Sequence, residues 1–208
     1  GADVDHFIAL KEEVNDIKVL NQSYRIPGGP IHELSQNIIN KVQNRFDKDY
    51  KPRDDEGILK RYSDITQVDM SKGNWLVLSS ANYFLDDAKD LCEIQGWYYQ
   101  FKGRNSIPLK LLMALNNWEA WRKDAQLNHL EIKNIYEYLG SHVLPGFQKG
   151  KTLHSDTKYL MRDCRAEHGL VTDSVWYEAF EGLDNMTETY IRNMRANGEM
   201  INKNPRII

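Results

Sequence analysis

The fold is decided by the stretch WLVLSSANYFLDDAKDLCEIQGWYYQF, which spans residues 75–101. Its first four residues, 75–78, form a short continuous apolar run, which is typical of a strand buried on both faces of a parallel sheet. Apolar residues then recur at helical spacing, at Leu85, Ala88, Leu91 and Cys92. Gly96 follows as a stop signal, and residues 97–101 return to a strand pattern. The stretch therefore predicts a strand–helix–strand unit with parallel strands and a right-handed crossover.

A strand followed by a helix is also predicted nearer the N-terminus. Val19-Leu20 lead as a strand into residues 21–27, and a Gly28-Gly29-Pro30 turn follows. Proline suits the first turn of a helix, because the N–H that it lacks would have no partner there. The helix should carry one apolar stripe, formed by Ile31, Leu34, Ile38, Val42 and Phe46. Residues 52–57 break this pattern, and residues 58–62 favour a strand near a sheet edge, because that run contains two cationic side chains.

Residues 106–200 favour one helix after another. Ser106 is expected to cap the first of them, with Pro108 inside its first turn. Further helices are expected near residues 132–139, 155–168, 174–180 and 186–197, and the last three should end at Gly169, Gly182 and Gly198. The closing residues 205–208 favour the opening of a strand, which suggests a chain cut from a longer protein. The pattern as a whole predicts the α/β class: a parallel sheet with a largely α-helical inserted subdomain.

Composition excludes several classes of protein. The chain has 208 residues, of which 41% are hydrophobic and 27% charged, with a net charge of −3. The best apolar run, residues 107–115, contains Lys110 and is too short to span a membrane. The acidic N-terminus does not resemble a secretory signal, and two cysteines, Cys92 and Cys164, favour a reducing compartment. We therefore expect a cytoplasmic protein with no membrane partner and no general attraction to nucleic acid.

The sequence motifs for phosphate binding, metal binding and nucleophilic catalysis are incomplete in this chain. Gly150-Lys151-Thr152 resembles the end of a phosphate-binding loop, but Pro145 stands where the first glycine is required, so a plain loop is the better interpretation. None of the six histidines forms a zinc-type pair, and we expect no metal site. No G-x-S-x-G sequence surrounds a serine, and neither cysteine has a catalytic signature. These observations favour surface histidines and small buried cysteines.

Two stretches are candidate binding sites. Tyr24-Arg25 is placed by the pattern at the carboxyl end of a strand, where open α/β sheets bind ligands. An aromatic ring beside a guanidinium suits a nucleotide, since the ring stacks on the base and the guanidinium meets a phosphate. Residues 79–83, which include Ser80, Asn82 and Tyr83, occupy the same edge after the next strand and suit contacts to a phosphate–sugar backbone. On spacing alone, helix caps and turn residues explain both stretches equally well.

At these residues the sequence resembles the UvrD/Rep/PcrA-type superfamily 1 DNA helicases, and within them the compact forms common in phages. Residues 20–27, LNQSYRIP, are similar to helicase motif IV, which opens the second RecA-like domain. Residues 1–7 resemble the segment after motif III, and residues 75–82 resemble the next strand with its Arg-x-Asn segment. Residues 204–208 resemble the strand that leads into motif V. The resemblance implies a fragment that runs from after motif III to before motif V.

The resemblance implies roles for individual residues. Arg25 would be the catalytic arginine finger, reaching the γ-phosphate of ATP, and Tyr24 would stack on the adenine. Ser80, Asn82 and Tyr83 would form the contact with single-stranded DNA. Two positions depart from the family pattern: Ser23 stands where Asn is common, and Ser80 where Arg is usual, which weakens or moves the DNA contact.

The resemblance also implies a division of the chain. Residues 1–105 would form part of the second RecA-like domain, residues 106–200 a helical insertion like the 2B subdomain, and residues 201–208 a strand returning to the RecA-like domain. No Walker A or Walker B motif is present in this sequence. ATP and Mg²⁺ would therefore be bound mainly by a first RecA-like domain, and we expect the isolated chain to hydrolyse no ATP.

A second interpretation stays open. The chain could be a non-catalytic α/β-plus-helical module that binds a partner protein or single-stranded DNA. A dedicated DNA-binding module should bind an oligonucleotide tightly and with a steep salt dependence, because binding releases counterions. A helicase fragment with a net charge of −3 should bind weakly. A third interpretation, a nucleotide-binding enzyme built around Lys151-Thr152, has the least support.

Overall fold

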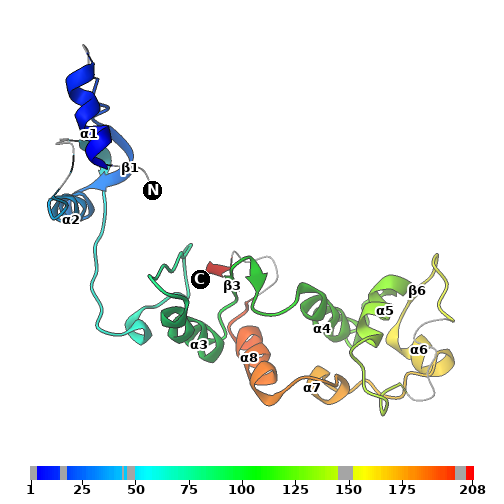
Figure 1. The fold of residues 1–208 in the computed structure, drawn as a ribbon. Helices are drawn as coiled ribbons and strands as arrows, with labels where there is room; N and C mark the ends of the chain where they lie inside the picture. Colours follow the sequence, from blue (N-terminus) through cyan, green and yellow to red (C-terminus); the bar gives the residue numbers. More distant parts are fainter. Residues whose placement is uncertain (1–3, 15–17, 44, 46–49, 145–151, 200–204) are drawn as a thin grey trace. The chain divides into compact units, whose positions relative to one another are not determined.

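The computed structural model describes residues 4–14, 18–43, 45, 50–144, 152–199 and 205–208. Contacts divide the chain into an N-terminal unit, Gly1–Ser63, and a C-terminal unit, Asp64–Ile208. Figure 1 shows the helices and strands of both units. The predicted boundary near residue 105 lies inside the C-terminal unit, and the assignment of segments to helicase subdomains stays a prediction.

The N-terminal unit contains one parallel strand–helix–strand motif. Its elements are α1 (Val4–Glu13), β1 (Gln22–Gly28), α2 (Pro30–Ile39) and β2 (Lys51–Glu56). Strands β1 and β2 are parallel, and α2 connects them. Pro30 opens α2 as predicted, and Gly29 before it has a φ of 65°, a left-handed conformation that glycine adopts without strain. The sequence therefore predicts the beginning of this helix correctly.

The strands of this unit correct the sequence interpretation. The first strand starts at Gln22, after Val19-Leu20, and the second is β2, whereas residues 58–62 have no regular structure. The run KPRDDE of β2 is polar because its side chains are mostly exposed, and Pro52 is tolerated at an irregular point of a two-stranded sheet. Backbone pairing with β1, which no local pattern reveals, creates this strand. Helix α2 also ends at Ile39, short of Val42, and Phe46 lies outside the described residues.

The C-terminal unit begins with a small α/β layer. It contains the 3₁₀ turns η1 (Ile65–Gln67) and η2 (Asn82–Leu85), helix α3 (Asp86–Gln95), and strands β3 (Tyr99–Phe101), β4 (Arg104–Asn105) and β7 (Arg206–Ile207). The strand order is β4-β3-β7, with β3 and β7 parallel. Leu76 forms a parallel bridge with Ile207, so β7 lies between the segment around Leu76 and β3. This confirms the α/β class.

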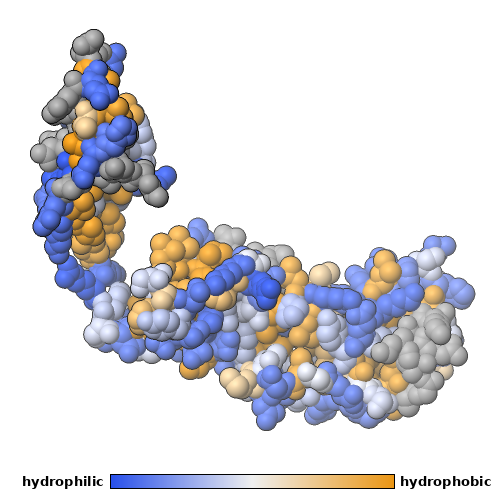
Figure 2. Space-filling model, in the orientation of Figure 1, coloured by the Kyte–Doolittle hydropathy of each residue, from blue (hydrophilic) through white to orange (hydrophobic). Residues whose placement is uncertain are grey.

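The predicted strand–helix–strand unit of residues 75–101 is confirmed in its helix and its last strand. Helix α3 ends at Gly96, whose φ is 67°. The prediction of the first strand is wrong. Residues 75–78 form only an isolated bridge, and 63% of Leu76 and 80% of Leu78 are exposed. Their apolar character was expected to bury them on both faces, but no described element covers the outer side. Figure 2 shows hydrophobic residues gathered on the surface of this unit, over the segment that precedes α3.

The remainder of the C-terminal unit is helical, as predicted. Its helices are α4 (Leu109–Trp121), α5 (His129–Tyr136), α6 (Met161–Glu167), α7 (Trp176–Ala179) and α8 (Asn185–Ala196), and a short antiparallel pair joins β5 (Leu127–Asn128) to β6 (Lys158–Tyr159). The predicted helix 155–168 is therefore shorter, because Lys158 and Tyr159 pair with β5. The predicted stops at Gly169 and Gly198 are confirmed, since each follows the C-cap of its helix and has a positive φ angle, whereas α7 ends at Ala179, before Gly182.

The core of the C-terminal unit is aromatic and aliphatic. Its largest fully buried side chains are Trp118, Trp121, Tyr136, Met70 and Leu115. The indole of Trp118 donates to the Ser174 carbonyl (3.0 Å), and that of Trp121 to the Tyr159 carbonyl (3.0 Å). Helix α4 begins after Pro108, and the predicted cap Ser106 is wrong, since its hydroxyl hydrogen-bonds instead with the Tyr190 hydroxyl at 2.7 Å. Tertiary packing thus takes the polar group that would have capped the helix.

Candidate nucleotide and DNA contacts

Tyr24 and Arg25 lie on an irregular stretch of β1. Gln22 pairs with Lys51 and Pro27 with Arg53, so residues 23–26 of β1 face only Pro52 of β2. A bulge of this kind disrupts the hydrogen-bonded ladder and re-aims side chains, and such bulges are frequent next to functional sites. The sequence interpretation is corrected here, because these two residues lie within the strand and not beyond its end.

Ser23 fixes the backbone of this bulge. Its Oγ accepts hydrogen bonds from the backbone N–H of Arg25 (3.4 Å) and of Ile26 (3.0 Å). Two N–H groups freed from the sheet therefore find a local acceptor, as serine side chains commonly provide in turns. The short serine side chain is therefore a structural part of this bulge.

The side chains on the bulge are open to solvent. Tyr24 is 84% exposed, and Arg25 is also exposed. Within the described part of the chain no carboxylate forms an ion pair with Arg25, whereas the nearby Arg53 pairs with Asp55 at 2.6 Å. The Arg25 guanidinium is thus able to meet an anion that arrives from outside this unit.

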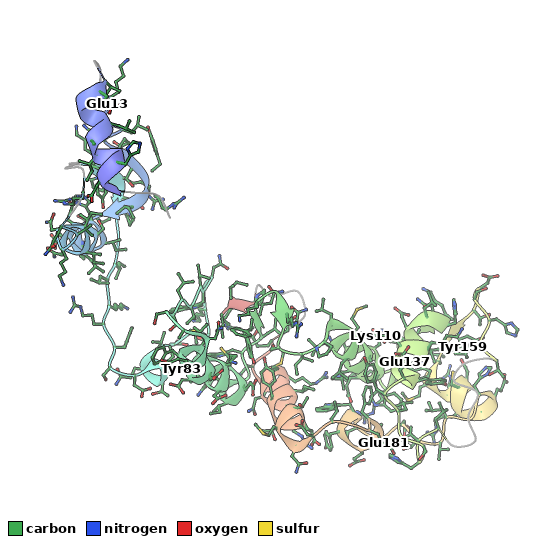
Figure 3. The ribbon with its side chains drawn as sticks, viewed as in Figure 1. Glu13, Tyr83, Lys110, Glu137, Tyr159 and Glu181 are labelled. Carbon is green, nitrogen blue, oxygen red and sulfur yellow. The ribbon has the colours of Figure 1, made fainter. Side chains whose placement is uncertain are left out.

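The predicted DNA-contact residues lie in the C-terminal unit. Ser80, Asn82 and Tyr83 are exposed, and Asn82 opens the 3₁₀ turn η2. Tyr83, labelled in Figure 3, is 66% exposed, and its ring centroid lies 4.1 Å from that of Phe84, which is 55% exposed. Exposed aromatic rings of this kind are the groups on which unpaired bases stack. Sequence reasoning missed Phe84, although two adjacent aromatic residues before a helix were a visible signal.

The other candidate groups support no second chemical site. Burial raises the pKa of the Cys92 thiol to about 12 and that of Cys164 to about 11, so both are protonated and unreactive near neutral pH. Among the described residues, no group of three or more His, Cys, Asp or Glu side chains is placed to hold a metal ion. Gly150 and Lys151 lie outside the described residues, and Thr152 Oγ1 lies 2.9 Å from His168 Nδ1.

In the part of the chain that is described, each helix is too short or too polar to cross a lipid bilayer. Tyr24 and Arg25 belong to one unit, and Ser80, Asn82 and Tyr83 to the other. Comparison of the chain with protein-family models, with curated proteins and with solved structures finds no match.

Proposed function

We propose that this chain is part of the second RecA-like motor domain, with its helical insertion, of an ATP-dependent DNA helicase. In that protein, ATP hydrolysis would drive translocation on single-stranded DNA and unwinding of the duplex. The proposal places the protein in the cytoplasm of a bacterium or of a phage-infected host. The α/β class and the parallel strand–helix–strand motif around α2 are compatible with a motor domain of this kind.

The observation that carries the proposal is the exposed Arg25 on a bulged strand. An arginine finger must reach a phosphate held by another domain, so it must be exposed, free of a local carboxylate and aimed by a fixed backbone. Arg25 meets these conditions within the described residues, and Ser23 holds its backbone. Closure of the two motor domains would bring the guanidinium to the γ-phosphate, where it would stabilise the charge that develops during transfer.

Tyr24 and the η2 segment would bind the two substrates. Tyr24 would stack on the adenine of ATP. Asn82 and Ser80 would hydrogen-bond to the DNA backbone, while Tyr83 supplies a ring for a base. ATP and Mg²⁺ would be bound mainly by the first RecA-like domain, and Tyr24 and Arg25 are the residues of this chain that would contact the nucleotide.

The test is DNA-stimulated ATP hydrolysis by the protein that contains both motor domains. Arg25→Ala should lower kcat by about a thousandfold, because an arginine finger contributes about that much or more, and should leave DNA affinity unchanged. The matched control is Arg61→Ala, an exposed arginine of the same unit that lies outside β1. The 208-residue chain alone should hydrolyse no ATP. Equal kcat values for the Arg25 and Arg61 variants would overturn the proposal.

A binding module is the second candidate, and the exposed Leu76, Leu78, Tyr83 and Phe84 favour it. It is distinguished by titrating the isolated chain with single-stranded DNA at several salt concentrations. Tight binding with a steep salt dependence would indicate a dedicated DNA-binding module. Weak binding, together with loss of ATPase activity in the Arg25 variant, would support the helicase proposal.

A further inference from the structure

A groove of about 490 Å³ runs between α3 and α8 in the C-terminal unit. The two helices lie side by side, as Figure 1 shows. Six of the side chains that line the groove are Asp90, Glu93 and Ile94 from α3, and Met186, Thr189 and Asn193 from α8. None of these residues belongs to the proposed nucleotide or DNA contacts.

The walls of the groove are held in place by hydrogen bonds. The Asn193 amide donates to the Ile94 carbonyl at 3.0 Å, and the Tyr190 hydroxyl donates to the Trp97 carbonyl at 2.9 Å. A Cβ at Gly96 would lie 2.3 Å from the backbone of Asn193, so the end of α3 and the body of α8 are in close approach. The groove is therefore formed before anything binds, which lowers the entropic cost of binding.

Two large apolar side chains in the groove are left in water. Ile94 is 69% exposed and Met186 is 77% exposed, although each belongs to a helix whose other face packs into the core. Methionine is flexible and polarisable, and it is over-used at surfaces that bind apolar side chains of other proteins. Both residues would gain from burial against an apolar ligand.

The charge in the groove has one sign. Asp90 and Glu93 line it, and no lysine or arginine does so among the described residues. The cations of α8 interact elsewhere: Arg192 pairs with Glu188 at 2.6 Å and lies 3.8 Å from the centre of the Tyr177 ring, and Arg195 donates to Asn116. The groove thus complements a ligand that is both apolar and positively charged.

We propose that this groove binds an amphipathic helix of a partner protein, with large aliphatic side chains facing Ile94 and Met186 and a lysine or arginine facing Asp90. A third helix fits the groove between two packed helices, and helix-in-groove recognition uses apolar anchors at helical spacing. This interaction surface is independent of the proposed ATP and DNA contacts, and the helicase proposal stands or falls separately.

The test uses a peptide of about 14 residues with leucine and lysine at helical spacing, which is close to the shortest length at which a helix forms alone. It is titrated into the 208-residue chain while backbone amide shifts are followed by NMR. Saturable binding should shift the amides of α3 and α8. A peptide of the same pattern with glutamate in place of lysine should bind at least about tenfold more weakly.

Two variants locate the binding. Met186→Asp should weaken the leucine–lysine peptide by at least about tenfold, because the lost burial is that of one large side chain. Leu130→Asp is the matched control, a substitution at a residue of α5 that is 65% exposed and outside the groove, and it should leave the affinity unchanged. Both variants should keep the unfolding midpoint, which shows that the fold is intact.

Each of these results would overturn the proposal: no saturable binding, equal affinity for the two peptides, equal weakening by Met186→Asp and Leu130→Asp, or the same amide shifts caused by single-stranded DNA. Self-association of the chain that Met186→Asp abolishes would also overturn it, since the groove would then be an interface between copies.

Discussion

The two units of this chain bury their side chains very differently. Among the residues of Gly1–Ser63 whose burial is described, only Gly28 is buried, whereas the C-terminal unit buries a continuous set of aromatic and aliphatic side chains. Both units contain parallel strands and amphipathic helices. The difference is therefore not in secondary structure but in how much apolar surface each unit removes from water.

A helix pattern does not by itself make a core. Three residues of the predicted stripe, Ile31, Leu34 and Ile38, lie on α2, yet 59% of Ile38 is exposed. A single parallel pair with one helix offers too little surface to cover it, since parallel sheets are normally covered on both faces. We expect the N-terminal unit to open more readily than the C-terminal unit.

The largest expected difference in stability between the two units concerns two arginine–carboxylate pairs. Arg206 and Glu199 form a buried pair at 2.9 Å, and Arg206 also donates to the Met70 carbonyl at 2.8 Å. Arg206→Ala removes the cation that pairs with the buried Glu199 carboxylate, so it should lower the free energy of unfolding of the C-terminal unit by about 4 kcal/mol. Arg53→Ala, which removes the exposed pair with Asp55, should cost less than about 1 kcal/mol.

Urea unfolding followed by tryptophan fluorescence measures the loss of stability in Arg206→Ala, because all five tryptophans lie in the C-terminal unit. Amide hydrogen exchange in β1 and β2 measures the loss in Arg53→Ala. The double variant Arg206→Met with Glu199→Leu should recover most of the loss, since it removes both charges together. Similar costs for Arg206→Ala and Arg53→Ala would contradict the contrast between the units.

The next largest difference in stability is expected for the same substitution, isoleucine to alanine, in two helices. Ile135 of α5 is completely buried, and Ile38 of α2 is mostly exposed. Ile135→Ala should cost about 3 kcal/mol, because it leaves a cavity in a packed core, whereas Ile38→Ala should cost less than about 0.5 kcal/mol. Amide exchange in each helix provides the measurement. A large loss at Ile38 would reveal a core in the N-terminal unit.

A smaller effect concerns the beginnings of these helices. Asn128 caps α5, accepting from the N–H groups of Leu130 and Glu131, and the Glu131 side chain accepts from the Asn128 N–H in return. Asn128→Ala should lower stability by about 1 kcal/mol. The N-cap residue of α2 is Gly29, which has no side chain that could cap the helix. Thermal unfolding tests this, with Asn128→Asp as the control that keeps an acceptor; equal losses in both variants would exclude capping as the cause.

The smallest effect depends on pH. His142 Nε2 lies 2.9 Å from the Glu178 carbonyl and Nδ1 lies 3.1 Å from Glu181, and these contacts raise the pKa of His142 above 6.5. A raised pKa means that the protonated form stabilises the fold. The contribution is complete below the unfolded pKa and is lost as the pH rises through the folded one.

The urea midpoint of the wild-type protein should therefore exceed that of His142→Gln more at about pH 6 than at about pH 8. Glu181→Gln keeps the size of the side chain but removes its charge, and it should reduce this pH dependence. A difference between wild type and His142→Gln that grows with pH would show that the neutral imidazole is the stabilising form.

The sequence allowed the helices to be predicted better than the strands. Helices α2, α3, α5 and α8, and the glycines that end α3 and α8, follow from spacing along the chain, because helical hydrogen bonds join residues four apart. Strand β2 was missed because its residues are polar and its pairing partner lies far away in the sequence. The predicted burial of residues 75–78 was wrong, because an apolar run is buried only if another element covers it.

For the candidate site, too, the sequence indicates the residues but not the backbone geometry that positions them. Tyr24, Arg25, Ser80, Asn82 and Tyr83 could be selected from the sequence, and their exposure agrees with a binding role that stays a prediction. The bulge that carries Tyr24 and Arg25 could not be predicted, because a bulge is a mismatch between two strands. The groove between α3 and α8 likewise joins residues about 100 positions apart.

The α/β class, the order of the helices and the glycines that end α3, α6 and α8 could be predicted from the sequence, because they depend on neighbouring residues. Which apolar residues are buried, how β7 enters the sheet between Leu76 and β3, and where Ser106 and Arg206 find their partners could be learned from the tertiary structure alone. Those outcomes depend on contacts between distant segments, where burial and unsatisfied polar groups outweigh local preference.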